Sequence, residues 1–190
     1  MYQKYQTEAI VLKSRESGEA DKLVSLFTKD FGLVRARASA VRAEHSRMRY
    51  ALQNYARANV GLVKGKRGWR VAGAAALKVA TGDPRAIAAF ARSAELAIRL
   101  VHGEEKNDYL FAALSEAHEA LMVERCDAYG TIELVCVARI LYALGYISTE
   151  ALSTALFTHT AYTGESLLEA ETMKDKLLFS INKAIAETHL

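Results

Sequence analysis

The chain has 190 residues, of which 51% are hydrophobic, and a formal net charge of +3. That length can bury one or two cores, and the composition is that of a folded protein and not of a disordered tail. The apolar runs fall short of the roughly 20 residues that span a bilayer, and the first residues show no secretory pattern. We therefore expect a cytoplasmic protein without a membrane segment.

The modest net charge hides two halves of opposite sign. Residues 1–82 carry 16 Lys and Arg against 6 Asp and Glu, a net +10, whereas residues 83–190 carry 9 against 16, a net −7. Between residues 31 and 82 there are eleven basic residues and a single acidic one, Glu44. Such an asymmetry predicts that the N-terminal half binds a polyanion.

The N-terminal half has the pattern of a small β-barrel. Five short runs with alternating or β-branched character are separated by glycines; they cover residues 8–12, 22–28, 33–41, 52–63 and 69–77. Residues 42–50, between the third and fourth runs, are polar and basic, and could form a short helix or an ordered crossover. Five strands with an insertion at that point predict an OB-type barrel over residues 1–80.

The third strand shows the clearest alternation. Its small apolar residues fall on one face, at Val34, Ala36, Ala38 and Ala40. Arg35, Arg37 and Ser39 fall on the other face. Because successive side chains of a strand point to opposite faces, we expect one packed face and one cationic face.

Residues 83–190 predict a small bundle of helices, so the fold class is α+β. Asp83 is suited to cap a first helix with Pro84 at its first position, and His102-Gly103 is suited to end it. Asn107 can cap a second helix. A third helix is expected over residues 131–144, ending at Gly145 and apolar enough to be central. A short helix should begin at Ser148, and the last is marked by an apolar stripe of Met173, Leu177, Ile181 and Ile185.

Clustered lysines and arginines are the strongest functional signal, because neutralised phosphates release counterions and so support binding without sequence preference. OB-folds bind oligonucleotides across strands two and three and beside the loops that join strands one to two and four to five. The candidate DNA-binding residues are Arg35, Arg37, Arg42, Arg47, Arg49, Lys64, Lys66, Arg67 and Arg70. The loop after the first strand is instead acidic, with Glu16, Glu19 and Asp21, and is expected to face away from the DNA or to contact protein.

Aromatic side chains on which bases stack also contribute to single-strand binding. Tyr50, Tyr55 and Trp69 are the candidates. Trp69 follows the basic hairpin directly, but an aromatic residue at the start of a strand more often plugs the barrel. Tyr50, beside Arg47 and Arg49, is the better candidate for an exposed platform.

Nothing in the sequence supports catalysis or a bound metal. Cys126 and Cys136 are too far apart for a zinc ribbon, so we expect buried free thiols, no metal and no cofactor. The segment 61–67 fails the phosphate-loop pattern, which needs four residues between its glycines and a hydroxyl residue after the lysine. Arg139, within the predicted central helix, is either a paired structural charge or part of a site for an acidic peptide.

Two stretches of the sequence together resemble the bacterial RecO family of recombination mediators. They are TEAIVLKSRESGEADKLVSLFTKDFGLVRARASAVR and SRMRYALQNYARANVGLVKGKRGWRV, with ARILYALGY as a fainter third. The resemblance implies an OB-fold followed by a helical domain, binding and annealing of single-stranded DNA, and cooperation with RecR, single-strand-binding protein and RecA. The four-cysteine zinc cluster of many members is not carried over, because the chain has only two cysteines. The chain is also shorter than is usual for the family.

The sequence therefore predicts a non-enzymatic, nucleoid-associated mediator of DNA repair that binds single-stranded and possibly double-stranded DNA through residues 1–80. Residues 83–190 are expected to form a protein-contact module. Two alternatives remain open: an OB-fold protein that binds RNA or acts in translation, and an adaptor whose basic barrel docks an acidic protein.

Overall fold

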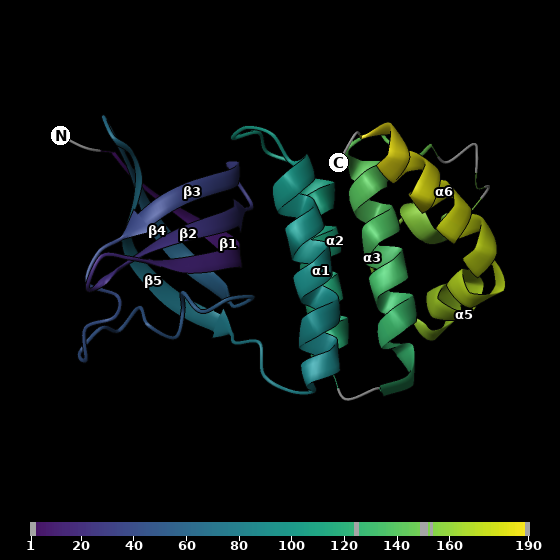
Figure 1. Ribbon diagram of the computed structural model, residues 1–190, viewed down its shortest axis with the longest axis horizontal. Helices are drawn as coiled ribbons and strands as arrows, with labels where there is room; N and C mark the ends of the chain where they lie inside the picture. Colours follow the sequence, from purple (N-terminus) through teal and green to yellow (C-terminus); the bar gives the residue numbers. More distant parts are fainter. Residues whose placement is uncertain (1–2, 124–125, 149–151, 153, 189–190) are drawn as a thin grey trace. The chain divides into compact units, whose positions relative to one another are not determined.

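The computed structural model describes residues 3–123, 126–148, 152 and 154–188 (Figure 1). The chain divides into two compact units, which are described separately below. The barrel unit comprises residues 1–81 and 101–107, and the helical unit comprises residues 82–100 and 108–190. The expected fold class, a five-stranded barrel followed by helices, is confirmed.

Five strands close the barrel in the order β1-β2-β3-β5-β4 (Figure 1). The strands are β1 (Lys4–Ser17), β2 (Asp21–Thr28), β3 (Gly32–Ala38), β4 (Arg57–Gly65) and β5 (Gly68–Lys78). Neighbours in this order run antiparallel, except that β3 and β5 pair in parallel. The interior is filled by small and branched apolar side chains contributed by all five strands.

Strand β1 is longer than predicted, because it pairs with β4 along its first half and with β2 along its second half. Its first half, Lys4–Ile10, pairs with β4, and Ala9–Ser17 pairs with β2. The register shifts between Val11 and Lys13. A bulge of this kind bends a strand and increases its twist, which allows one strand to serve two neighbours.

Residues 39–56 form the crossover between β3 and β4, and it contains turns and no helix. The segment 52–56, predicted as strand, belongs to this crossover. It docks at the bulge of β1, where the Tyr55 N–H donates to the Val11 carbonyl at 2.7 Å and the Val11 N–H donates to the Ala56 carbonyl at 2.9 Å. Tyr55 adopts a φ of 66°, a left-handed conformation that no strand continues through, so β4 begins later than the sequence predicts.

The alternation predicted for β3 is confirmed as far as Ala38. Val34, Ala36 and Ala38 are buried, while Arg35 and Arg37 are exposed. Ala40, expected on the packed face, is exposed and has a φ of 55°. Its N–H donates to Asp21 Oδ1 at 2.9 Å, so an acidic side chain of β2 holds the turn that follows the strand. The strand ends at Ala38, three residues before the predicted end.

The helical unit is built around one central helix. Its helices are α1 (Pro84–Leu100), α2 (Asp108–Leu121), α3 (Tyr129–Ala143), α5 (Gly164–Thr172) and α6 (Lys174–Glu187), with 3₁₀ turns η1 (Cys126–Ala128) and η2 (Ala155–Phe157). Helix α3 contacts α1, α2, α5 and α6, which confirms its predicted central place. Asp83 caps α1 as predicted, its Oδ1 accepting from the Arg85 N–H at 2.8 Å.

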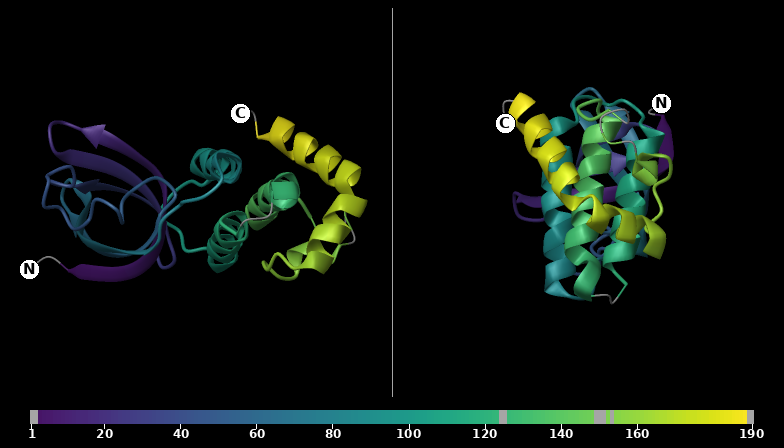
Figure 2. Two further views of the ribbon diagram at one scale, coloured as in Figure 1. Left: turned by 90° about the horizontal axis from the view of Figure 1, so that it is seen from below. Right: turned by 90° about the vertical axis from the view of Figure 1, so that its right-hand side faces the viewer.

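The C-terminal part of the helical unit differs from the sequence prediction. The helix expected from Ser148 falls largely outside the described residues. Helix α5 was missed, although Thr163 begins it as an N-cap whose Oγ1 accepts from the Ser166 N–H at 3.2 Å. Helices α5 and α6 meet at a sharp bend (Figure 2). Within the described part of the chain, every helix is too short or too polar to span a membrane.

Arg139 is the largest fully buried side chain, and the backbone surrounds it. Its guanidinium donates to three main-chain carbonyls, those of Leu156 at 3.0 Å, Thr160 at 2.7 Å and Ala161 at 3.2 Å. It also lies 4.6 Å from the centre of the Tyr162 ring. These contacts favour the structural interpretation, because the nitrogens that an acidic peptide would need already hold the segment between η2 and α5.

The loop 101–107 belongs to the barrel unit, although the sequence places it in the helical half. Its contact with the barrel depends on Gly32, at the start of β3. Gly32 has a φ of +62°, and a Cβ there would lie 2.1 Å from the carbonyl oxygen of Glu105. Only glycine permits both this backbone conformation and this close approach.

We expect Gly32→Ala to lower the free energy of unfolding of the barrel by about 2 kcal/mol or more, because a left-handed alanine alone costs roughly 1–2 kcal/mol and the Glu105 contact is lost as well. Urea unfolding followed by the emission of Trp69, the only tryptophan, measures the change. Gly18→Ala is the matched control, since Gly18 has a φ of +67° but nothing within 4 Å of the added Cβ. Equal losses for the two variants would show that the loop contact contributes nothing.

Candidate nucleic-acid interface

A tight turn between β4 and β5 displays a run of basic residues. Gly65 pairs with Gly68 at the end of the ladder, which leaves Lys66 and Arg67 at the tip. Gly68 has a φ of +96°, a conformation that such a two-residue turn needs and glycine readily supplies. Both tip side chains are exposed. We refer to residues 64–68 as the basic hairpin.

The topology of the barrel brings the basic hairpin beside the cationic face of β3. The parallel pairing of β3 with β5 sets Arg37 opposite Arg70 and Ala36 opposite Trp69. A cavity of about 470 Å³ lies there, and it is lined by Arg37, Ser39, Gly65, Lys66, Arg67, Gly68, Trp69 and Arg70. Four of these residues are cations and, among the described residues that line the cavity, none is acidic. We call this cavity the basic pocket.

Several predicted DNA-binding residues already have ion-pair partners within the barrel unit. Arg37 pairs with Asp21 at 2.7 Å and Arg42 with Glu16 at 3.1 Å. The pKa of Asp21 is lowered, first by the Ala40 N–H and then by Arg37. Glu16 and Asp21 therefore lie against the basic surface. The sequence analysis had expected this acidic segment to face away from the DNA or to contact protein.

The crossover residues are not among those that line the basic pocket. Arg49 donates to the carbonyls of Arg42 at 3.0 Å and Ala43 at 2.7 Å, which holds the crossover turns together. Arg47 is exposed. Three of the nine predicted cations make ion pairs within the described residues; they are Arg37, Arg42 and Lys64. The other six make none there; they are Arg35, Arg47, Arg49, Lys66, Arg67 and Arg70. Three of those six line the basic pocket.

The aromatic candidates separate clearly by exposure. Trp69 is only 6% exposed, whereas Tyr50 is 65% exposed. The Trp69 ring packs edge-on against Tyr5, with centroids 5.7 Å apart, and against Phe31 at 5.5 Å. Trp69 therefore has the position of a barrel plug, Tyr55 is half-buried, and Tyr50 is the most exposed of the three candidates for stacking. Tyr5 and Phe31, which the sequence analysis did not single out, complete this aromatic cluster.

Lys64 lies between this aromatic cluster and the loop 101–107. Its ammonium is 5.1 Å from the centre of the Trp69 ring and 2.7 Å from a carboxylate oxygen of Glu104. The hydrogen bond from Lys64 is the main cause that lowers the pKa of Glu104. No local pattern predicts the pairing of Glu104 with Lys64, because the two residues are 40 positions apart in the sequence.

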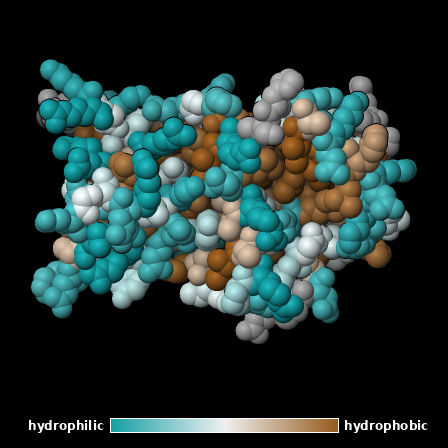
Figure 3. Space-filling model, in the orientation of Figure 1, coloured by the Kyte–Doolittle hydropathy of each residue, from teal (hydrophilic) through white to brown (hydrophobic). Residues whose placement is uncertain are grey.

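The barrel surface suits a hydrophilic ligand. On the face drawn in Figure 3, the region over the strands labelled in Figure 1 is mainly hydrophilic, and the apolar residues gather over the helices. A phosphate backbone is recognised by lysine and arginine side chains of this kind. The arrangement can hold a polyanion by charge and hydrogen bonding, without any covalent step.

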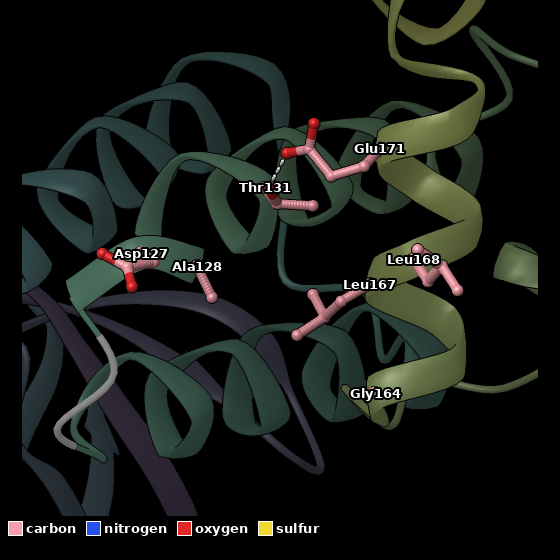
Figure 4. Close-up of a pocket in the computed structure, with 7 residues that line it drawn as sticks. All are labelled: Asp127, Ala128, Thr131, Gly164, Leu167, Leu168 and Glu171. Carbon is pink, nitrogen blue, oxygen red and sulfur yellow. Dashed lines mark hydrogen bonds between the residues drawn. The ribbon is translucent and has the colours of Figure 1, made fainter.

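The helical unit has a pocket of a different character. A cavity of about 550 Å³ lies between η1, the start of α3 and α5 (Figure 4). Ala128 and Leu167 face into this cavity. Glu171 turns towards Thr131, and the Thr131 hydroxyl donates a hydrogen bond to the Glu171 carboxylate. Its described lining, Asp127, Ala128, Thr131, Gly164, Leu167, Leu168 and Glu171, contains no histidine, cysteine or lysine.

The cysteines do not supply reactive groups in the described structure. Burial raises the pKa of the Cys136 thiol to about 11, so this thiol is protonated at neutral pH and a poor nucleophile. The side chain of Cys126 lies outside the described residues. Among the residues that the structure describes, no group of three or more His, Cys, Asp or Glu side chains is arranged to hold a metal ion.

Comparison with known proteins shows a similarity that covers most of the barrel. Residues 1–72 match the family model described as Recombination protein O N terminal. A DNA repair protein RecO from Desulfitobacterium hafniense (strain DSM 10664 / DCB-2) is 42% identical over 62 residues, which cover 33% of this chain and 23% of that protein. A DNA repair protein RecO from Dehalococcoides mccartyi (strain ATCC BAA-2266 / KCTC 15142 / 195) is 28% identical over 138 residues, covering 69% of this chain and 54% of that protein.

The chain thus spans about a quarter of the first relative and about half of the second. The family match falls on the strands and the basic hairpin described above, and the longer alignment reaches beyond them. Together these matches confirm the resemblance seen in the sequence: residues 1–72 are similar to the N-terminal domain of RecO proteins.

Proposed function

We propose that this chain acts in DNA repair and recombination by binding single-stranded DNA in the basic pocket and promoting its pairing with a complementary strand. The observation that carries the proposal is the convergence of Arg37 from β3 with Lys66, Arg67 and Arg70 of the β4–β5 region on one cavity. Its described lining contains no carboxylate that would repel a phosphate. The activity consists of binding and needs no catalytic group.

The mechanism is electrostatic. Two complementary DNA strands repel each other through their phosphates. Basic side chains that bind the phosphates of one strand reduce that repulsion. Contacts to the phosphate backbone position a strand without reading its sequence, so the base edges stay available for pairing. Tyr50 supplies an exposed ring on which one base can stack.

The partners follow from the family and are part of the proposal. The RecO resemblance implies cooperation with RecR, single-strand-binding protein and RecA, including assistance in recombinase loading. Residues 83–190 carry 16 acidic residues against 9 basic ones. That balance disfavours an extension of the DNA surface, so we assign the helical unit to protein contacts.

The rate at which two labelled complementary strands pair, without ATP and at low salt, tests the proposal. We expect the full chain to accelerate pairing and to bind single strands with an affinity that falls steeply with salt, with a logarithmic slope near −0.7 per phosphate contacted. Binding without faster pairing would leave a DNA-binding barrel and remove the annealing role.

The same assay separates the alternatives. Tighter binding to RNA than to DNA of the same sequence and length would favour an RNA-binding protein, because only contacts to the 2′-hydroxyl distinguish the two. Failure to bind any oligonucleotide at low salt would favour an adaptor that docks an acidic protein. Binding that is insensitive to salt would contradict the electrostatic mechanism.

A further inference from the structure

The contact between Lys64 and Glu104 places a carboxylate at the edge of the basic pocket. Lys64 precedes Gly65, which lines that pocket, and its ammonium is 2.7 Å from Glu104 Oε2. Both side chains keep access to solvent, with 57% and 40% of their surfaces exposed. The ion pair is therefore one that an incoming anion can reach.

A second donor lies beside the same carboxylate. Trp69 is 6% exposed, and its indole N–H is buried without a hydrogen-bond partner. This N–H nevertheless helps to lower the pKa of Glu104, after the larger contribution of Lys64. The Lys64 ammonium lies 5.1 Å from the centre of the same indole ring, so the two donors are neighbours. A buried donor left unpaired costs free energy, which an anion that reaches both Lys64 and this N–H would recover.

The carboxylate is held in place by the backbone of its own loop. Glu105, the next residue, packs against Gly32 so closely that no side chain fits between them. The loop 101–107 is part of the compact barrel unit. The backbone of Glu104 is thus part of a segment that is docked on the barrel.

We propose that Glu104 occupies a phosphate subsite of the barrel, formed by the Lys64 ammonium and the Trp69 indole N–H, and that single-stranded DNA displaces it on binding. The inference rests on the proposed function. A phosphodiester has two non-bridging oxygens that share one negative charge, and each can accept from one of the two donors, whereas Glu104 accepts from Lys64 and leaves the Trp69 N–H without a hydrogen bond. The phosphate belongs to a nucleic-acid strand and not to a small anion, because the adjoining pocket supplies three further cations that make no ion pair within the described structure, Lys66, Arg67 and Arg70; DNA follows from the proposed function.

Glu104→Gln tests the inference, because it removes the competing charge and keeps the size of the side chain. We expect it to tighten binding of a labelled oligothymidine of about 16 nucleotides by about two- to fivefold, the range for release from an exposed ion pair. In the Lys64→Met background, the same substitution should change nothing, since no subsite remains to be freed. The emission of Trp69 should change on DNA binding in wild type and not in Lys64→Met.

Glu105→Gln is the matched control, because it removes the same charge one residue away. Equal gains for the two Gln variants would show a general charge effect and overturn the inference. A gain that persists in the Lys64→Met background would overturn it as well. If wild type binds DNA and Glu104→Gln binds no tighter, the inference fails and the proposed function stands. If neither protein binds DNA, the proposed function fails.

Discussion

The double variant Arg67→Glu/Arg70→Glu is expected to bind single-stranded DNA on the order of a hundredfold more weakly than wild type at low salt. Both side chains line the basic pocket, and neither makes an ion pair within the described residues, so both are available to phosphates. Reversing the charge removes two attractive contacts and adds repulsion of the same strand. The logarithmic salt slope should shrink by about 1.4, which corresponds to two contacts on a single strand.

Fluorescence anisotropy with a labelled oligothymidine, repeated at several salt concentrations, gives both quantities. The matched control is Lys176→Glu/Lys183→Glu on α6, which changes the net charge of the chain by the same amount through two exposed residues. At moderate salt this control should retain its affinity, because salt screens exposed charges that do not contact the bound strand. A comparable loss in both variants would mean that net charge governs binding and that the basic pocket is not the site.

Two ion pairs on the barrel make substitutions of Arg37 and Glu16 less informative. Arg37 also lines the basic pocket, but its pairing with Asp21 makes a substitution there harder to interpret. Glu16 belongs to the acidic segment that was expected to face away from the DNA, but it pairs with Arg42. Its substitution would release a cation onto the basic surface, so it cannot serve as a neutral control.

The parts of the site that could be predicted are those with local signals. The cationic face of β3 follows from strict alternation at Arg35 and Arg37, and the basic hairpin from the two glycines that bracket its tip. Their meeting in one pocket follows from the OB topology, in which β3 and β5 pair in parallel. Each step depends on backbone geometry that short stretches of sequence encode.

The parts that could not be predicted are tertiary contacts between distant charges. Glu104 reaches Lys64 across 40 residues, and its segment resembled an ordinary connection between two helices. Trp69 has the same local sequence whether it plugs the barrel or faces a base. Its burial depends on Tyr5 of β1 and on Phe31 in the turn before β3. Side-chain identity shows which groups can pair, but the packing of the folded chain decides which ones do.

Arg139→Met is expected to destabilise the helical unit by about 3 kcal/mol or more, since it leaves three buried carbonyls without donors and each such loss costs about 1–3 kcal/mol. The methionine fills much of the volume but supplies no hydrogen bond to Leu156, Thr160 or Ala161. Arg139→Lys should recover part of the loss, because an ammonium keeps the charge but cannot spread its donors over three carbonyls as a guanidinium does.

Urea unfolding followed by circular dichroism at the helical band measures this loss, and the emission of Trp69 follows the barrel in the same samples. Arg92→Met is the control: Arg92 makes two close hydrogen bonds to Glu133, of 2.5 and 2.6 Å, but is 62% exposed. An exposed pair of this kind contributes at most about 1 kcal/mol. If Arg139→Met proves as stable as the control, the segment between η2 and α5 finds other donors, and the buried guanidinium is then free to serve a ligand.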